Sequence, residues 1–268
     1  MTFNDEVIAR IKANAANDAL RQGAQRFLEA SIGAGYSYNF AWMGRPIIQY
    51  PQDIVAMHEL IWATRPDLVI ETGIAHGGSL VMSASTLALL DYADAIQAGT
   101  TLDPRAPRRR VIGIDIDIRS HNRVAIEAHA MHNRIDMIQG SSVAPDMVAK
   151  VHELARGYQR ILVCLDSNHT HDHVLAELQA YAPLTTTGSY CCVFDTMIED
   201  VPNDSYPDRP WGVGNNPKTA VKEYLLHLEQ HPAIATDGRA LKFECDRSIQ
   251  DKLMVTVAPD GYLKRVDT

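Results

Sequence analysis

Acidic residues end four apolar segments of this 268-residue sequence. Glu71, Asp115, Asp166 and Asp195 each close a run of the kind that forms a buried β-strand, such as VIGID or ILVCLD. Acids are poor strand residues and are costly to bury, so four of them at corresponding places indicate a shared polar pocket. The alternative is that some only cap the helices that follow, which is credible for Asp166 alone but weak for the set.

A glycine-bearing turn follows the first of these acids in DLVIETGIAHGGSL, residues 67–80. Its glycines do not have the GxGxxG spacing of a dinucleotide site, and the Lys-Ser/Thr pair of a phosphate loop is missing. The turn still lets the backbone approach a ligand, and Asp115, about forty residues later, is placed to bind ribose hydroxyls. The combination favours a nucleoside-like ligand without a pyrophosphate, and we expect S-adenosylmethionine.

Three histidines stand at alternate positions in DSNHTHDHV, residues 166–174. A neutral imidazole at His169, three residues after Asp166, can accept a proton from an attacking hydroxyl, so both residues are predicted to be catalytic. The alternative is a transition-metal site of a hydrolase or hydroxylase, because imidazoles suit zinc or iron. The pattern is one residue short of the HxHxDH motif of metallo-hydrolases, however. We expect His171 and His173 to be surface residues at the start of a helix.

Alternating strands and helices must position these side chains. The strands are apolar throughout, which is typical of strands buried on both faces of a parallel sheet that helices cover on each side. The fold is therefore predicted to be a doubly wound α/β sheet, with ligands at the carboxyl ends of the strands and an antiparallel element at the end of the chain. The predicted strands span residues 67–72, 109–117, 135–140, 160–166 and 188–196. The last segment, residues 252–266, is predicted to form a strand and turn, with a hairpin as the alternative. The first two helices are predicted over residues 5–30 and 51–64.

Two irregular segments, residues 37–46 and 205–217, are too long to be simple connectors. Aromatic faces and arginine side chains suit a sugar or polyol that carries charged groups. The alternative is that the tryptophans cover the core and that the first arginine pairs with an acid. The residues predicted to bind the acceptor are Tyr38, Trp42, Arg45, Arg209 and Trp211.

Composition narrows the class of protein. Apolar residues make up 46% and charged residues 22% of the chain, as in ordinary globular proteins, and the net charge of −8 disfavours nucleic acid and anionic membranes as partners. No apolar run approaches the roughly 18 residues that span a bilayer. The N-terminus lacks a signal-peptide core, and the four cysteines include no CxxC pair, so we expect a cytoplasmic protein with reduced thiols. The N-terminal helix is a candidate contact of a homo-oligomer.

Several segments together resemble the cephalosporin hydroxylase / rhamnosyl O-methyltransferase family, from about residue 36 onward. They are YNFAWMGRPIIQYPQD, IETGIAHGGSL, IGIDIDIR, LDSNHTHDHVLAEL, DRPWGVGNNPKTAV and VAPDGYLKR. The resemblance implies the class I S-adenosylmethionine-dependent methyltransferase fold, with a mostly parallel seven-stranded sheet and an N-terminal helical extension. We expect a single domain over residues 1–268, in which residues 1–50 form the helix and substrate-side loop and residues 51–268 the catalytic core.

The resemblance also implies roles for individual residues. Asp166 and Asp195 are the expected Mg²⁺ ligands, helped by Asn168. The chain departs from its metal-dependent relatives at one position. These often have two adjacent acids after the fifth strand, whereas this chain has Phe194 before Asp195. The expected cofactor-binding residues are Glu71, Gly73, Ala75 and Ser79 at the methionine end, Asp115 at the ribose, Ser141 and Ser142 near the adenine, and Asp166.

The predicted function is methyl transfer from S-adenosylmethionine to a hydroxyl of a sugar or natural product, assisted by Mg²⁺. One alternative is a non-catalytic subunit that binds the cofactor and supports a partner enzyme, which the reduced metal motif suggests. The other alternative is the metal-dependent hydrolase or hydroxylase that would use the histidines.

Overall fold

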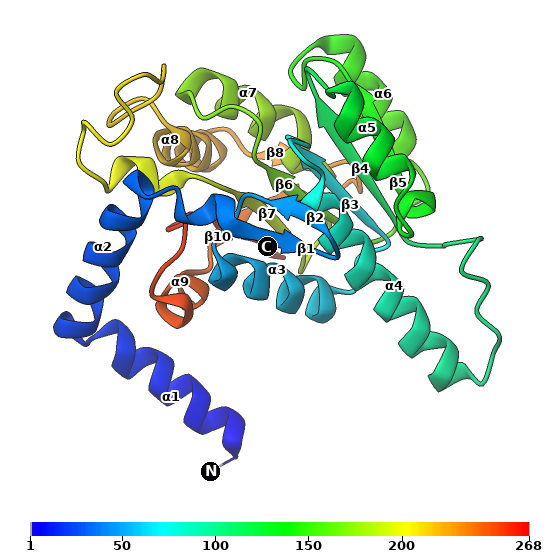
Figure 1. Ribbon diagram of the computed structural model, residues 1–268, viewed down its shortest axis with the longest axis horizontal. Helices are drawn as coiled ribbons and strands as arrows, with labels where there is room; N and C mark the ends of the chain where they lie inside the picture. Colours follow the sequence, from blue (N-terminus) through cyan, green and yellow to red (C-terminus); the bar gives the residue numbers. More distant parts are fainter. Residues whose placement is uncertain (1, 268) are drawn as a thin grey trace.

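A seven-stranded sheet covered by helices on both faces lies at the centre of the computed structural model, which describes residues 2–267 (Figure 1). Strands β3 to β7 are parallel, whereas β11 runs antiparallel between β7 and β10. The predicted doubly wound sheet with an antiparallel element at the end of the chain is therefore confirmed. Across the sheet the order is β10 (Phe243–Cys245), β11 (Tyr262–Arg265), β7 (Tyr190–Val193), β6 (Ile161–Leu165), β3 (Leu68–Thr72), β4 (Arg110–Asp115) and β5 (Ile135–Gln139).

The strands feed two hydrophobic cores, one on each face of the sheet. Val69 of β3 belongs to the first core and the next residue, Ile70, to the second, which explains why the strands are apolar without alternation. Helices α3 (Pro51–Thr64), α4 (Gly78–Ala98) and α5 (Ser120–Glu127) pack in the first core, and α6 (Pro145–Ala155), α7 (His171–Tyr181) and α8 (Pro217–Gln230) in the second.

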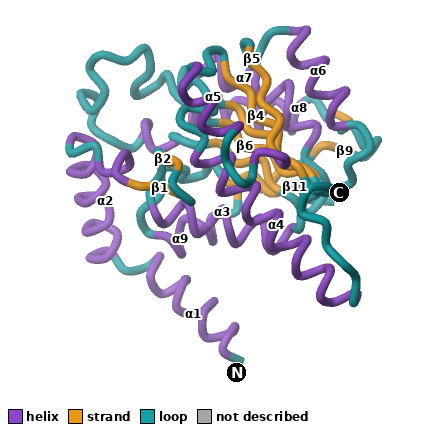
Figure 2. Tube along the Cα trace, turned by 45° about the vertical axis from the view of Figure 1, so that its right-hand side comes forward, coloured by secondary structure: helices purple, strands orange, loops and turns teal. Residues whose placement is uncertain are grey.

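Two helices form the N-terminal extension, where one was predicted over residues 5–30. They are α1 (Phe3–Ala15) and α2 (Asp18–Gly33). Asn17 separates them, because its side chain accepts a hydrogen bond from the N–H of Leu20 (3.1 Å) and so caps the start of α2. Helix α1 projects from the body of the protein, and none of its described residues is buried (Figures 1 and 2).

The end of the chain departs from the prediction of one strand and turn over residues 252–266. Only β11 is a strand within that range. It pairs antiparallel with β10, which precedes it in the sequence and is separated from it by the short helix α9 (Arg247–Leu253). The cause is Asp53, a fully buried residue of α3. Its carboxylate accepts hydrogen bonds from the Thr256 hydroxyl (2.5 Å) and the Val257 N–H (3.0 Å), so this apolar segment is bound to a helix instead of a strand.

Short elements complete the fold. Among the helices of residues 2–267, only α4 is long and apolar enough to cross a membrane, and half of that stretch is buried in the core, as expected of a core helix in a globular domain. The remaining strands are β1 (Phe40–Trp42) with β2 (Arg45–Ile47), and β8 (Ala233–Ile234) with β9 (Ala240–Leu241); the 3₁₀ turns span Tyr36–Asn39, His132–Arg134, Ala182–Leu184 and Thr196–Glu199.

Candidate functional site

The carboxyl ends of four neighbouring strands meet at one edge of the sheet. Thr72 of β3 lies opposite Ile114 of β4 and Leu165 of β6, and Leu165 lies opposite Val193 of β7. The strands therefore end level with one another. The acids that end them, Glu71, Asp115, Asp166 and Asp195, all lie at this edge, which is where ligands bind in doubly wound folds.

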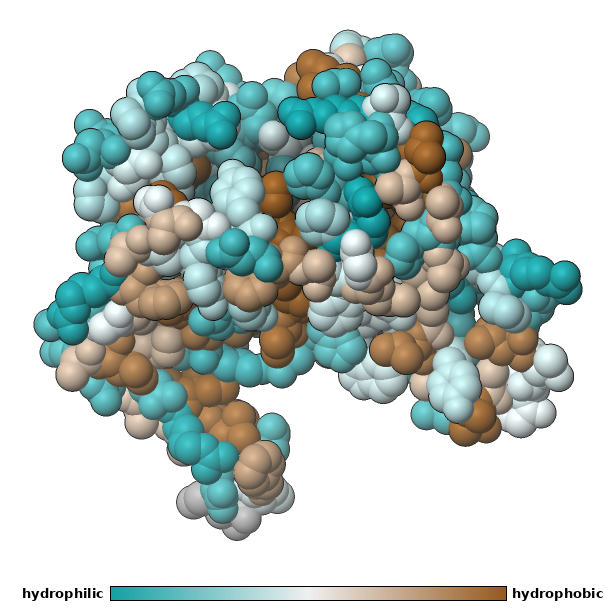
Figure 3. Space-filling view, viewed as in Figure 1, coloured by the Kyte–Doolittle hydropathy of each residue, from teal (hydrophilic) through white to brown (hydrophobic). Residues whose placement is uncertain are grey.

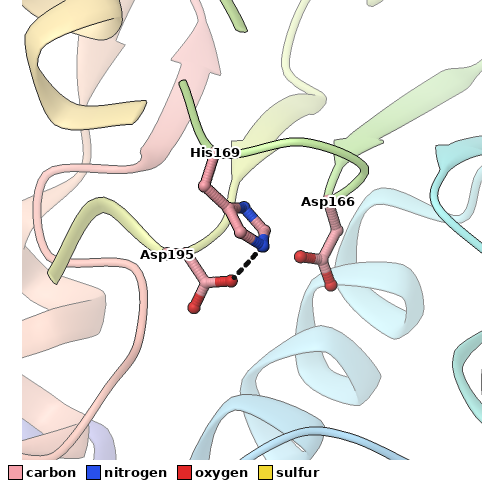
Figure 4. A group of neighbouring side chains, drawn as sticks. All are labelled: Asp166, His169 and Asp195. Atoms are coloured by element: carbon pink, nitrogen blue, oxygen red, sulfur yellow. Dashed lines mark ion pairs between the residues drawn. The ribbon is translucent and has the colours of Figure 1, made fainter. Parts of the chain in front are cut away.

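Asp166, His169 and Asp195 form a compact cluster (Figure 4). One possible ligand atom from each residue lies within 4.8 Å of the other two, and Nε2 of His169 is 3.1 Å from Oδ2 of Asp195. Asp166 directly follows β6, His169 lies in the loop before α7, and Asp195 follows β7. Asp195 has a φ of 56°, a left-handed conformation that few residues other than glycine adopt and that is concentrated at functional sites.

The charges at this edge repel one another. Burial raises the pKa of Asp166 well above its usual range, and the neighbouring carboxylates of Asp195 and Glu71 raise it further. Burial also raises the pKa of Glu71 to about 7, against the effect of a hydrogen bond from Ser79. A divalent cation between the acids would relieve this repulsion. Two carboxylates and one imidazole are a donor set that suits a divalent cation, and the carboxylates alone suit Mg²⁺.

The three histidines of DSNHTHDHV do not share a site. His171 contacts helix α8, with Nδ1 2.8 Å from the Thr219 hydroxyl and Nε2 3.1 Å from Glu223. His173 instead contacts the hydroxyl groups of Ser142 and Ser167. Both histidines are thus partly buried and bonded, which differs from the surface position expected of them. Within residues 2–267, His169 is the only histidine that belongs to a candidate metal cluster.

The glycine-bearing turn, Asp115 and Asp166 are built as one unit. Gly73 has a φ of 90°, and a Cβ atom added there would overlap the backbone carbonyl oxygen of Asp166. Oδ2 of Asp115 accepts hydrogen bonds from the N–H groups of Ile74 (2.8 Å) and Ala75 (3.2 Å). The position of the turn therefore depends on Asp115 on one side and on close packing against Asp166 on the other.

Arg45 and Trp42 lie behind this turn. The Arg45 guanidinium donates to the carbonyl oxygen of His76 (Nε, 3.0 Å) and to Oδ1 of Asn122 (3.1 Å), and Trp42 Nε1 donates to the Ser85 hydroxyl (2.9 Å). The buried Asn122, which sequence reasoning missed, also donates to the carbonyl oxygen of Ala75 (2.9 Å). Arg45 and Asn122 therefore support the turn, whereas Trp42 is bonded to helix α4. Neither Arg45 nor Trp42 lines the cavity beside the acid cluster.

A cavity of about 460 Å³ opens beside the acid cluster. Three of the five residues predicted to bind the acceptor line it, together with Ala75 and the cluster itself. The rings of Trp211 and His169 meet edge to face with their centroids 4.7 Å apart, and the Arg209 guanidinium lies 5.3 Å from the centre of the Trp211 ring. The aromatic and cationic residues of the wall include Tyr38, Arg209 and Trp211, which are candidates from the sequence, and Tyr50 and Tyr206, which are not.

Comparison with known proteins places the chain. Residues 34–266 match the family model described as Rhamnosyl O-methyltransferase/CmcI. The chain belongs to this family. Rhamnosyl O-methyltransferase of Mycobacterium tuberculosis (strain ATCC 25618 / H37Rv) is 26% identical over 240 residues, which are 86% of this chain and 82% of the relative. The Mycobacterium leprae (strain TN) protein is 27% identical over 225 residues, which are 84% and 82% of the two chains.

Solved CmcI structures share the fold. An apo structure superposes with a TM-score of 0.52 at 20% identity, covering 86% of this chain and 78% of the other. A CmcI structure described with Mg and SAM has a TM-score of 0.50 at 18% identity, covering 85% and 77%. The predicted family, the methyltransferase fold and the class of enzyme, an S-adenosylmethionine-dependent O-methyltransferase, are therefore confirmed.

Proposed function

We propose that this O-methyltransferase methylates a hydroxyl of a sugar or natural-product acceptor and that Asp166 and Asp195 hold a divalent cation, expected to be Mg²⁺. The observation that carries the proposal is the cluster of Asp166, His169 and Asp195. It lies between the glycine-bearing turn and the cavity of about 460 Å³ with aromatic walls, the aromatic cavity. The rhamnosyl O-methyltransferase relatives and the CmcI structure with Mg and SAM support it. When bound at this place, a cation would lower the pKa of an acceptor hydroxyl.

The cofactor would lie along the edge of the sheet from Glu71 to the segment after β5. Glu71, Gly73, Ala75 and Ser79 would surround its methionine end, and Ser79, at the first turn of α4, suits the carboxylate because helix N-termini bind anions. Asp115 would bind the ribose. The segment of Ser141 and Ser142 would lie near the adenine, and Asp166 would border the methyl group.

His169 would take the proton from the acceptor hydroxyl. Its Nε2 faces Oδ2 of Asp195, so Nε2 carries the hydrogen and donates it to the carboxylate. Nδ1 has no hydrogen-bond partner among the described residues and is the nitrogen that can accept a proton. A carboxylate that orients an imidazole and stabilises its charged form is the arrangement of catalytic Asp–His pairs. Oδ1 of Asp195 stays available to a cation.

The acceptor would bind in the aromatic cavity. Tyr38, Trp211 and the neighbouring tyrosines offer flat apolar surfaces for sugar rings, and Arg209 offers charge-assisted hydrogen bonds. Ile32 and Gly33 of α2 also line the cavity, which supports a single domain over residues 1–268, with residues 1–50 as the substrate-side segment and residues 51–268 as the core. Trp42 and Arg45 do not line this cavity, so no acceptor contact is assigned to them.

A methyl-transfer assay tests the proposed function. The enzyme is incubated with S-adenosylmethionine, Mg²⁺ and a panel of rhamnosyl and other glycoside acceptors, and the products are analysed by mass spectrometry and NMR. We expect an O-methylated acceptor and an equal amount of S-adenosylhomocysteine. If the protein binds S-adenosylmethionine in calorimetry but methylates none of these acceptors, the alternative of a non-catalytic cofactor-binding subunit is favoured.

We further infer that the chain forms a homo-oligomer and resides in the cytoplasm. Large apolar side chains lie exposed where α3 meets the outer half of α4, as is typical of interfaces: Trp62, Leu89, Tyr92 and Ile96. Figure 3 shows hydrophobic groups on the surface of the projecting end of α4. Light scattering measures the oligomeric state. All four cysteines are free, which fits a reducing compartment, and fractionation of cells tests this location.

A further inference from the structure

Helix α7 presents a polar stripe to the core. His173, Glu177 and Tyr181 are spaced by four residues and therefore lie on one face of the helix. The side chains of Glu177 and Tyr181 are fully buried, and that of His173 is 23% exposed. The stripe does not face solvent. It faces two loops that carry ligand-binding residues in the proposed function.

Glu177 joins those two loops. Its Oε1 accepts hydrogen bonds from the hydroxyl groups of Ser142 (2.5 Å) and Ser167 (2.6 Å). The Tyr181 hydroxyl donates to the backbone carbonyl oxygen of Ser142 (2.5 Å). Ser142 belongs to the loop after β5 and Ser167 to the loop after β6. Because β3 and β4 lie between these strands in the sheet, no strand pairing holds the two loops together.

The hydrogens of this network can be assigned. Each serine has one hydroxyl hydrogen, and both hydrogens point to Oε1 of Glu177. Nε2 of His173 lies 3.1 Å from the Ser142 oxygen, 3.2 Å from the Ser167 oxygen and 3.4 Å from Oε1 of Glu177. It therefore carries a hydrogen that is directed at these acceptors. Oε2 of Glu177 is buried and has no partner among residues 2–267.

A buried carboxylate with one unpartnered oxygen is costly, and an apolar side chain would pack here at lower cost. The presence of a glutamate at position 177 is therefore better explained by the two loops that it connects than by a contribution to the stability of the fold. Ser142 stands in the segment proposed for the adenine, and Ser167 directly follows the proposed cation ligand Asp166.

Resting on the proposed function, we propose that Glu177 is a positioning residue that couples the cofactor site to the cation site. It holds the loops of Ser142 and Ser167 in one arrangement, so that a ligand that orders one loop also orders the other. The cation then raises the affinity for S-adenosylhomocysteine, and by linkage S-adenosylhomocysteine raises the affinity for the cation by the same factor.

The test is calorimetric titration of S-adenosylhomocysteine into the full chain with and without saturating Mn²⁺. For the wild type we expect Mn²⁺ to lower the Kd by about fivefold or more, at the lower end of ordinary coupling between sites. In Glu177→Gln, which keeps the shape but places an amide donor in the network, we expect the ratio to fall close to one. Ser142→Ala and Ser167→Ala should each lower the ratio, and they replace Glu177→Gln if that variant does not fold.

The matched control is His171→Gln, on the same helix but bonded to α8. It should keep the wild-type ratio. Absence of coupling in the wild type, or an unchanged ratio in Glu177→Gln and in both serine variants, would overturn this inference and leave the proposed function intact. Failure of the wild type to bind S-adenosylhomocysteine at all would instead overturn the proposed function.

Discussion

Nε2 of His169 lies 3.1 Å from Oδ2 of Asp195, and the two residues belong to the loops that follow the neighbouring strands β6 and β7. This contact joins two roles that the sequence suggested separately, a base and a metal ligand. An imidazole held by a carboxylate of the proposed cation site has a fixed orientation beside the acceptor cavity. The same closeness means that His169 itself is within reach of a cation, so the two roles have to be separated by experiment.

His169→Ala separates them. If His169 is the base, kcat should fall by roughly 10²–10⁴-fold, the usual range for loss of a general base. The affinities for S-adenosylhomocysteine and Mn²⁺, measured by calorimetry, should stay near wild type, and His171→Ala should have little effect on kcat. A fall of Mn²⁺ affinity parallel to the fall of kcat would show that His169 is a metal ligand instead.

Gly73→Ala should disturb the site through a steric clash. The added methyl group meets the carbonyl oxygen of Asp166, in addition to the strain of a φ of 90°. Gly157→Ala is a matched control, because Gly157 has the same φ but open space around it. We expect Gly73→Ala to lower the free energy of unfolding by about 1–3 kcal/mol more than the control does, and to weaken cofactor binding. Equal losses in urea unfolding would show that the packing between the turn and Asp166 is unimportant.

Asp115→Ala should weaken S-adenosylmethionine binding by roughly 1.5–3 kcal/mol, the scale for hydrogen bonds to a charged group. The carboxylate would lose its contact with the ribose and its hold on the N–H groups of Ile74 and Ala75. Asp115→Asn keeps one acceptor oxygen and should lose less. Calorimetry measures both, and unchanged affinity in Asp115→Ala would remove this residue from the cofactor site.

The stability of the metal-free protein should depend on pH through Glu71. Its pKa of about 7 in the folded protein lies above the ordinary value of 4.5, so its contribution is present in full below about 4.5 and is lost as pH rises through about 7. Glu71→Gln should therefore reduce the decline in unfolding free energy between about pH 5 and about pH 8. Part of the decline should remain, because burial raises the pKa of Asp53 to about 6.

Urea unfolding with EDTA present, at several pH values, measures this dependence. The control is Glu244→Gln, at an exposed position on β10, which should leave the decline unchanged. Identical declines in the wild type and in Glu71→Gln would contradict the assignment.

The central strands could be predicted because strands that are buried on both faces are apolar at every position. A run such as residues 161–165 is apolar throughout, and the acids that end these runs point to the ligand edge. The prediction failed where a single polar contact decides the structure. Asp53 binds Thr256 and Val257, which turns a strand-like segment into a loop, and Asn17 divides the N-terminal helix by capping.

The acceptor side could be predicted only in part. Tyr38, Arg209 and Trp211 line the cavity, whereas Arg45 is bonded to the turn and Trp42 to helix α4. Arginine and tryptophan suit either kind of place, and only the fold decides between them. The sequence did not distinguish Glu177 from a surface glutamate. Helical spacing places it on one face with His173 and Tyr181, and such a mixed polar and aromatic face does not predict burial.

The most direct test of the central claim is a crystal structure of the protein with S-adenosylhomocysteine and Mn²⁺, using anomalous scattering to locate the ion. We predict one anomalous peak at about 2.0–2.4 Å from carboxylate oxygens of Asp166 and Asp195, with the cofactor along Glu71, Gly73 and Asp115. Cofactor bound at this edge with no anomalous peak beside Asp166 and Asp195 at saturating Mn²⁺ would contradict the metal-assisted mechanism.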